Sequence, residues 1–397
     1  MTEFDIYTGK ITYKDIEFSF VFDKRELRLI PPKDMQREVE LWFMEEIKEG
    51  CYTLGKSVYI DDDFLVGTTT ETNQKFIFIP SHHSVGRYNS TLFVDIRAYI
   101  LHKYDEDGIN RLSFSSSEID YIFPTTSAFN YPSWSKDGRV AVETKDFAST
   151  TSEPREFVVD DKNVTVSFGI TRITNSKISK PPITLKSVMF FEFEKTRDYM
   201  FILKLCNIAK EFIQYLCYRR NINNFTIDVS APAKDGKHQK IANMFILDSE
   251  ESLTENETLE KNKYICYNFI SGNEGTILSD IAKGTLYTRH IPISYNHGRR
   301  IDASRFVMIT AAFEWEFKRL YPNGVKRSPK IVEAENIATT HIESLISQNT
   351  GTLKNIYKFL KKLIKTDSLQ KEIQQVGKDF ADIIDVLGNR LYTLNNE

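Results

Sequence analysis

The spacing of the apolar residues changes along this chain, and this change constrains the fold more than any other feature. Up to about residue 193, short runs alternate apolar and polar positions, as around Phe18, Phe20 and Phe22. Such alternation places apolar side chains on one face of a β-strand. The turn-forming residues 105–108 lie between two such runs and indicate a hairpin. We therefore predict an antiparallel sandwich or barrel in the first half of the chain.

From about residue 274 the apolar residues recur every three or four positions, which is the spacing of amphipathic helices. Asp302 is placed to cap a helix that runs to Tyr321, and Pro329 to begin the next one. Two further helices are expected over residues 353–364 and 369–387. Four amphipathic helices with short connections predict an antiparallel bundle. Its interior is expected to hold Phe306, Phe313, Phe380 and Leu387.

The segment between these two halves mixes both patterns. A helix is predicted over residues 197–219, where apolar residues cover more than one face, and strands are predicted over 225–229 and 244–247. A chain of 397 residues is too long for one ordinary domain. The predicted fold class is therefore α+β. It comprises a β-rich, sandwich-like or barrel-like domain (residues 1–195), a mixed α/β connecting region (196–300) and a helical bundle (301–397).

Composition narrows the functional classes. Because the net charge is only −3, a nucleic-acid contact would have to come from a local basic patch. No Cys-x-x-Cys pair occurs, so we expect no metal centre, no redox motif and no cofactor. The acidic first residues and the lack of an apolar run of ~20 residues predict a cytoplasmic protein without a membrane span. The cysteines, interpreted as buried free thiols, are Cys51, Cys206, Cys217 and Cys266.

Residues 305–317 carry an Arg-Phe pair, several apolar residues and then an Ala-apolar-Glu-aromatic run. This segment resembles the opening helix of ApeA-like HEPN domains, and residues 190–193 and 386–391 are similar to other segments of that family. The resemblance implies an antiphage defence protein with an HEPN-like bundle, which forms homo-oligomers and cleaves RNA in abortive infection after an unknown phage or cellular trigger. Glu314 is nearly as well explained by a helix-surface salt bridge. The matching positions are Asp302, Arg305, Phe306, Ala312, Phe313, Glu314 and Trp315.

HEPN ribonucleases carry an Arg and a His four to six residues apart. The cation stabilises the developing phosphorane charge, and the imidazole moves the proton of the RNA 2′-hydroxyl. No such pair occurs after residue 300, and no His follows Arg390. We therefore expect this chain to be inactive alone, as a fragment or truncated form of a ribonuclease. The alternative is a non-enzymatic protein whose β-rich half binds a ligand and whose bundle dimerises; a toxin-neutralising partner protein is a third hypothesis.

Two basic segments are candidates for RNA contact. Arg299 and Arg300 end a polar loop that also holds His290 and His297; a phosphate contact and an ordinary connector both fit this sequence. On the third predicted helix, lysines form one face and apolar residues the other. Phosphate binding is the functional interpretation of this face, and a solvated surface is the alternative. The lysines are Lys354, Lys358, Lys361 and Lys362.

Other candidate residues have simpler interpretations. Arg97 and His102 have the HEPN spacing, but on a predicted strand this separation places them on opposite faces. Arg219 at the end of a predicted helix is explained by the helix dipole. The remaining candidates are the run Asp61–Asp63, interpreted as a solvated turn, the histidines at 82–83, interpreted as an exposed loop pair, and His341, interpreted as a core histidine.

Overall fold

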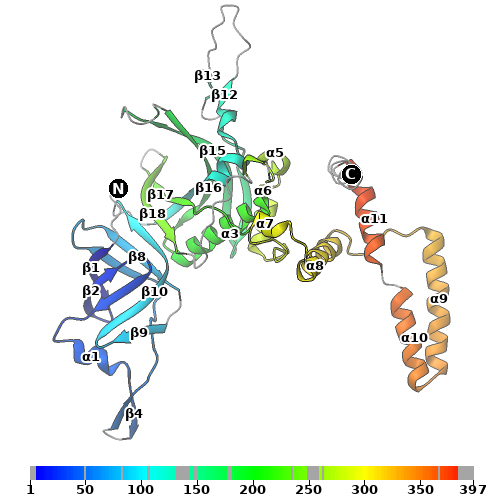
Figure 1. Cartoon of the computed structure of the whole chain (residues 1–397), viewed down its shortest axis with the longest axis horizontal. Helices are drawn as coiled ribbons and strands as arrows, with labels where there is room; N and C mark the ends of the chain where they lie inside the picture. Colours follow the sequence, from blue (N-terminus) through cyan, green and yellow to red (C-terminus); the bar gives the residue numbers. More distant parts are fainter. Residues whose placement is uncertain are drawn as a thin grey trace, which may run out of the picture. The chain divides into compact units, whose positions relative to one another are not determined.

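The computed structural model describes residues 6–48, 51–81, 84–104, 108–130, 143–146, 150–176, 181, 183–233, 236–247, 259–261, 263–364 and 367–382. Within these residues the chain is mixed α+β, with a closed six-stranded β-barrel, further strands and a helical region (Figure 1). It divides into two compact units. The β-rich unit comprises residues 1–285 and 291–299, and the helical unit comprises residues 286–290 and 300–397.

The barrel is built from β1 (Tyr7–Tyr13), β2 (Ile16–Phe22), β3 (Glu26–Ile30), β7 (Leu65–Thr69), β8 (Lys75–Pro80) and β10 (Thr91–His102). All neighbouring strands pair antiparallel, in the order β3, β2, β1, β7 and β8. The long strand β10 pairs with both β3 and β8, which closes the barrel. The barrel-like arrangement predicted for the first half of the chain is confirmed.

Phenylalanine rings fill the barrel. Phe18, Phe20 and Phe22 of β2 are all buried, as their alternation with Ser19 and Val21 predicts. Phe78 of β8 meets two of these rings edge-on, with ring centroids 5.4 Å from Phe20 and 5.0 Å from Phe22. The barrel interior is therefore a packed aromatic core.

Close approach of β1 and β7 depends on a glycine. A Cβ atom added at Gly9 would lie 2.1 Å from the carbonyl oxygen of Thr68 and 2.5 Å from the Phe20 ring. The Thr68 oxygen belongs to the backbone of the neighbouring strand, so it cannot rotate away. Any side chain at residue 9 would have to separate the two strands.

We expect Gly9→Ala to destabilise the β-rich unit by about 1–3 kcal/mol, because the added methyl group overpacks the barrel wall. Gly86→Ala is the matched control, since its Cβ would meet nothing closer than Phe93 at 3.5 Å. Urea denaturation followed by intrinsic fluorescence measures both. Equal midpoints for the two variants would show that β1 and β7 are not packed as described.

A second group of strands continues the sheet beyond the barrel. It comprises β11 (Ile109–Ser115), β14 (Arg155–Val159), β15 (Lys162–Thr174), β16 (Ile183–Thr196), β17 (Thr226–Pro232) and β18 (His238–Ile246). They pair in the order β14, β15, β16, β11, β17 and β18, and β18 then pairs with β10 of the barrel. One continuous antiparallel sheet thus links the barrel to the rest of the β-rich unit.

The predicted helix over residues 197–219 is present as α3 (Tyr199–Cys217), and it is buried on several faces, as its sequence predicts. Its Cys206 thiol lies 3.6 Å from the Met244 sulfur of β18, so α3 packs on the sheet. Two shorter helices flank it, α2 (Ser117–Ile122) and α6 (Glu274–Ala282). The other short elements of this unit are α1 (Gln36–Leu41), β4 (Met44–Lys48), β5 (Cys51–Leu54), β6 (Val58–Tyr59), β9 (Ser84–Tyr88), a 3-10 turn (Thr125–Ala128), β12 (Phe129–Asn130), β13 (Glu143–Thr144), α5 (Tyr267–Ile270) and α7 (Tyr295–Gly298).

The helical unit contains α8 (Ala303–Leu320), α9 (Pro329–Gln348), α10 (Gly351–Ile364) and α11 (Leu369–Asp379). Asp302 caps α8 as predicted, because its Oδ1 accepts a hydrogen bond of 2.7 Å from the Arg305 backbone N–H. Pro329 is the first residue of α9, also as predicted. None of the described helices is both long and apolar enough to cross a membrane.

The predicted four-helix bundle is not confirmed. Helices α9 and α10 form an antiparallel hairpin, and neither contains a buried residue. The prediction for Phe306 is wrong: the residue is 60% exposed, because no described element covers it. Phe313 and Phe380 are half-buried, and Leu387 lies outside the described residues.

Candidate functional site

The two residues that carry the family resemblance do not form one site. Arg305 and Glu314 are nine residues apart on α8. Nine residues span two and a half helical turns, so the two side chains leave α8 on opposite sides. Glu314 faces α11 instead, where its charge adds to the effect of burial in raising the pKa of Glu372.

Arg305 lies beside His290, a histidine from the loop that precedes α7. Burial lowers the pKa of His290, the Arg305 charge lowers it further, and Glu316 opposes this shift. Tyr287 stands with its ring 6.1 Å from the His290 ring and 6.2 Å from Trp315. The structure therefore brings a histidine and an arginine together in the helical unit, although their separation in sequence gave no sign of it.

The polar loop residues divide between the two units. Arg299 belongs to the β-rich unit and Arg300 to the helical unit, and both side chains are exposed. His297 lies in the short helix α7. Ser294 caps this helix, because its hydroxyl oxygen accepts a hydrogen bond of 3.1 Å from the His297 backbone N–H. Because Arg299 and Arg300 belong to different units, the described residues do not form one phosphate site within either unit.

The basic face predicted on the third helix belongs to α10. Lys358 and Lys362 are exposed, whereas Lys354 and Lys361 are half-buried. Lys361 forms an ion pair with Glu343 of α9 at 2.5 Å, which fixes one lysine at the contact between the two helices. The accessible part of the basic face is therefore the side of Lys358 and Lys362.

The opposite side of α10 is apolar and uncovered. Ile356, Leu360 and Leu363 are 48%, 40% and 50% exposed. We define an apolar hairpin face, whose members are Ile331, Ile337 and Leu345 of α9 and Leu353, Ile356, Phe359, Leu360 and Leu363 of α10. His341 of α9, interpreted from the sequence as a core histidine, is exposed on this same stripe, because none of the described helices covers it.

A polar cleft of about 360 Å³ opens in the β-rich unit where β11 ends and β17 begins. Helix α2 and β16 complete its walls. Its lining, which we call the polar cleft throughout, consists of Ser115, Ser116, Ser117, Asp120, Lys186, Asn223, Asn224 and Thr226. Sequence patterns gave no sign of this cleft, because its residues come from four separate elements.

A buried ion pair stabilises the wall of the polar cleft. Arg219 and Glu118 lie 3.0 Å apart, and each side chain is 1% exposed. Glu118 Oε1 also accepts hydrogen bonds from the backbone N–H of Asn223 at 3.0 Å and from its Nδ2 at 3.2 Å. Arg219 Nε donates to the Asn221 carbonyl oxygen at 2.7 Å. Arg219 is thus a structural cation, and its attribution to the helix dipole alone is wrong, since the buried Glu118 is its partner.

Asp120 links the cleft to the sheet. Pairing of β11 with β16 ends at Phe114 and Met189. The backbone N–H of Ser187 lies beyond that end, and it donates to Asp120 Oδ1 at 2.7 Å. Burial raises the pKa of the Asp120 carboxyl, while the Ser187 hydrogen bonds and the charge of Lys186 oppose the rise. A carboxyl group with a raised pKa in a cleft is a feature of functional sites.

The remaining sequence candidates stay apart from this site. Arg97 is exposed on β10 and His102 is buried, which agrees with their expected positions on opposite faces of a strand. Asp61 pairs with Lys14 at 2.8 Å in an exposed contact. The histidines at 82–83 lie outside the described residues. Cys206 and Cys217 are buried free thiols, but Cys51 is exposed and Cys266 half-buried, so burial of all four cysteines is wrong.

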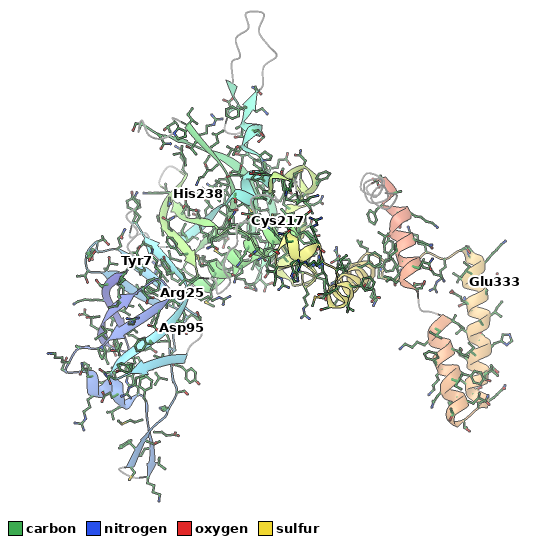
Figure 2. The ribbon with its side chains drawn as sticks, in the orientation of Figure 1. Tyr7, Arg25, Asp95, Cys217, His238 and Glu333 are labelled. Carbon is green, nitrogen blue, oxygen red and sulfur yellow. The ribbon has the colours of Figure 1, made fainter. Side chains whose placement is uncertain are left out.

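Burial explains why the buried thiols are unreactive. It raises the pKa of Cys217, the residue labelled at the end of α3 in Figure 2, to about 12. Because the thiolate is the reactive form, Cys217 serves packing. The described residues contain no cluster of three or more side chains that could hold a metal ion.

Comparisons with family models, with curated proteins and with solved structures found no match for this chain. Function therefore has to be argued from the residues themselves. Two features carry such an argument: the apolar hairpin face of the helical unit and the polar cleft of the β-rich unit.

We expect Arg219→Met to destabilise the β-rich unit by about 3–5 kcal/mol, because it leaves the Glu118 carboxylate buried without its cation. The double variant Glu118→Leu/Arg219→Met should cost less than the two single variants together, since no charge stays buried alone. Arg220→Met, at an exposed neighbour, is the control. Urea denaturation of the wild type, Glu118→Leu, Arg219→Met and the double variant measures the coupling, and strictly additive costs would contradict the ion pair.

Proposed function

We propose that this chain is a non-enzymatic binding protein whose helical unit associates with a second copy of itself. The observation that carries this proposal is the apolar hairpin face. Eight of the large apolar side chains that are exposed on this helical hairpin belong to one face, and contiguous apolar surface of this kind usually marks an interaction site.

The residues of the apolar hairpin face lie on the same side of α9 and α10. On α9 the half-buried contact positions include Ile342 and Ile346, and on α10 they include Tyr357 and Ile364. The exposed apolar residues are rotated from these contact positions in the same sense on each helix. In an antiparallel pair of helices, two such flanks coincide and form one continuous face.

A second copy of the hairpin fits this face. Its eight members are apolar, so two copies related by a twofold axis can bury them, with His341 of α9 on the same stripe. The charged residues of the hairpin, such as Glu333 in Figure 2 and Lys358, lie outside it. Helices of 20 and 14 residues are about 30 and 21 Å long, which offers a surface of the order of the ~800 Å² per partner in a standard interface.

We expect the full chain to be dimeric and the variant Ile356→Glu/Leu360→Glu to be monomeric, because two carboxylates would be desolvated in the interface. Lys358→Glu, on the opposite side of α10, should leave the dimer intact. Size-exclusion chromatography with light scattering over a range of concentrations gives the mass. A wild-type monomer at every concentration, or a dimer that tolerates both glutamates, would refute self-association through this face.

A second proposal rests on the resemblance to ApeA-like HEPN proteins: the helical unit contacts RNA. The specific observation in its favour is the exposed pair Lys358 and Lys362, on a helix with four lysines and no acidic residue. The grouping of His290 with Arg305, elsewhere in the helical unit, supplies the residue types that RNA chemistry uses, but in another spacing from the family motif. Antiphage defence and abortive infection are the biological role that this resemblance implies.

We expect Lys358→Glu/Lys362→Glu to weaken RNA binding and to lower its log–log salt slope by about 0.7 for each lost contact with single-stranded RNA. Lys361 is left unchanged because it pairs with Glu343. Lys330→Glu, an exposed lysine in the first turn of α9, controls for net charge. Fluorescence anisotropy measures the affinity. Equal salt slopes for the wild type, the double variant and the control would show that α10 does not contact RNA. The bound RNA should remain uncleaved.

A further inference from the structure

The polar cleft of the β-rich unit offers many hydrogen-bonding groups and no ring to stack on. Its lining contains four hydroxyl groups, two carboxamides, one carboxylate and one ammonium group. The carboxylate of Asp120 and the ammonium group of Lys186 balance one another. The lining therefore complements a ligand that is neutral and rich in groups that both donate and accept hydrogen bonds.

We propose that the polar cleft binds a small neutral carbohydrate through Asp120, Asn223, Asn224 and the surrounding hydroxyl groups. Each sugar hydroxyl donates one hydrogen bond and accepts others. Asn224 and Ser115 can also do both, and Asn223 keeps its carbonyl oxygen as an acceptor because its Nδ2 donates to Glu118 and Ser117. Adjacent hydroxyls of a sugar ring therefore find partners here. The volume of about 360 Å³ lies within the range of small-molecule sites, roughly 300–1,000 Å³.

Two of the proposed contacts are held in place before a ligand arrives. Glu118 accepts hydrogen bonds from both the backbone and the side chain of Asn223, and Arg219 holds Glu118 in position. The backbone N–H of Ser187 donates to Oδ1 of Asp120 and thereby fixes the orientation of this carboxyl group. Groups fixed in this way lose little freedom on binding, which favours affinity.

Charged ligands fit the cleft less well. An anion would lie near the Asp120 carboxylate, and a cation near Lys186, so each would meet a like charge in a partly desolvated site. A nucleobase would lack an aromatic partner in the lining. The proposal does not depend on self-association of the helical unit, since every lining residue belongs to the β-rich unit.

Saturation-transfer NMR on the full chain tests the proposal directly. The probes are D-glucose, D-galactose, D-mannose, D-ribose and N-acetyl-D-glucosamine, with zwitterionic glycine and anionic acetate as charged comparisons. We expect transfer to at least one sugar. Asn224→Ala and Thr226→Val should each weaken that binding roughly two- to tenfold, the loss of one hydrogen bond. Both residues are exposed and lie at the cleft rim, so the fold should survive.

Thr68→Val is the matched control for Thr226→Val, because Thr68 is also an exposed threonine on a strand, but in the barrel. It should bind the sugar as the wild type does. Circular dichroism checks that each variant is folded. If one of the two cleft variants is unfolded, the sugar affinity of the other one tests the proposal. Absence of transfer to every sugar, equal binding by the cleft variants and the control, or transfer to glycine or acetate alone would overturn the proposal.

Discussion

The shared strand β10 is the constraint on which the rest of the β-rich unit depends. Along one edge it pairs first with β9 and then with β8, and along the other edge first with β3 and then with β18. Hydrogen bonds on both edges remove its backbone from water over most of its length, and Ala98, Ile100 and Leu101 are fully buried. Closure of the barrel and continuation of the sheet therefore both depend on the pairing of β10. A disturbance of β10 would release the barrel and uncouple β18, which supports α3.

The Glu118–Arg219 ion pair fixes the position of residues that line the polar cleft. Its partners come from α2 and from the segment after α3, so the pair ties two elements that no strand pairing connects. Desolvation of both charges makes such a pair a poor source of net stability, but it strongly disfavours arrangements that separate them. The pair thereby fixes Asn223, and the cleft obtains a defined wall from an interaction that a ligand does not touch.

Local patterns in the sequence sufficed to predict element types and their faces. The alternation around Phe20 predicted an inward-facing strand, and Asp302 and Pro329 predicted where two helices begin. Non-local pairings could not be read in this way. Glu118 and Arg219 are separated by 101 residues, and nothing near either residue indicates the other. The exposure of Phe306 was missed for a related reason: periodicity shows which helix face is apolar, but not whether another element covers it.

The near-neutral net charge conceals a separation of charge on α10 that matters for function. Its four lysines lie away from the apolar hairpin face, so self-association would leave Lys358 and Lys362 exposed to a second partner. The two interactions respond differently to salt. Phosphate contacts weaken steeply as ionic strength rises, because the counterions they release gain less entropy in a saltier solution, whereas burial of apolar surface is not screened. Ionic strength would therefore separate the two proposed roles of this helix: a dimer that persists in salt while RNA binding is lost would show that the two faces act independently.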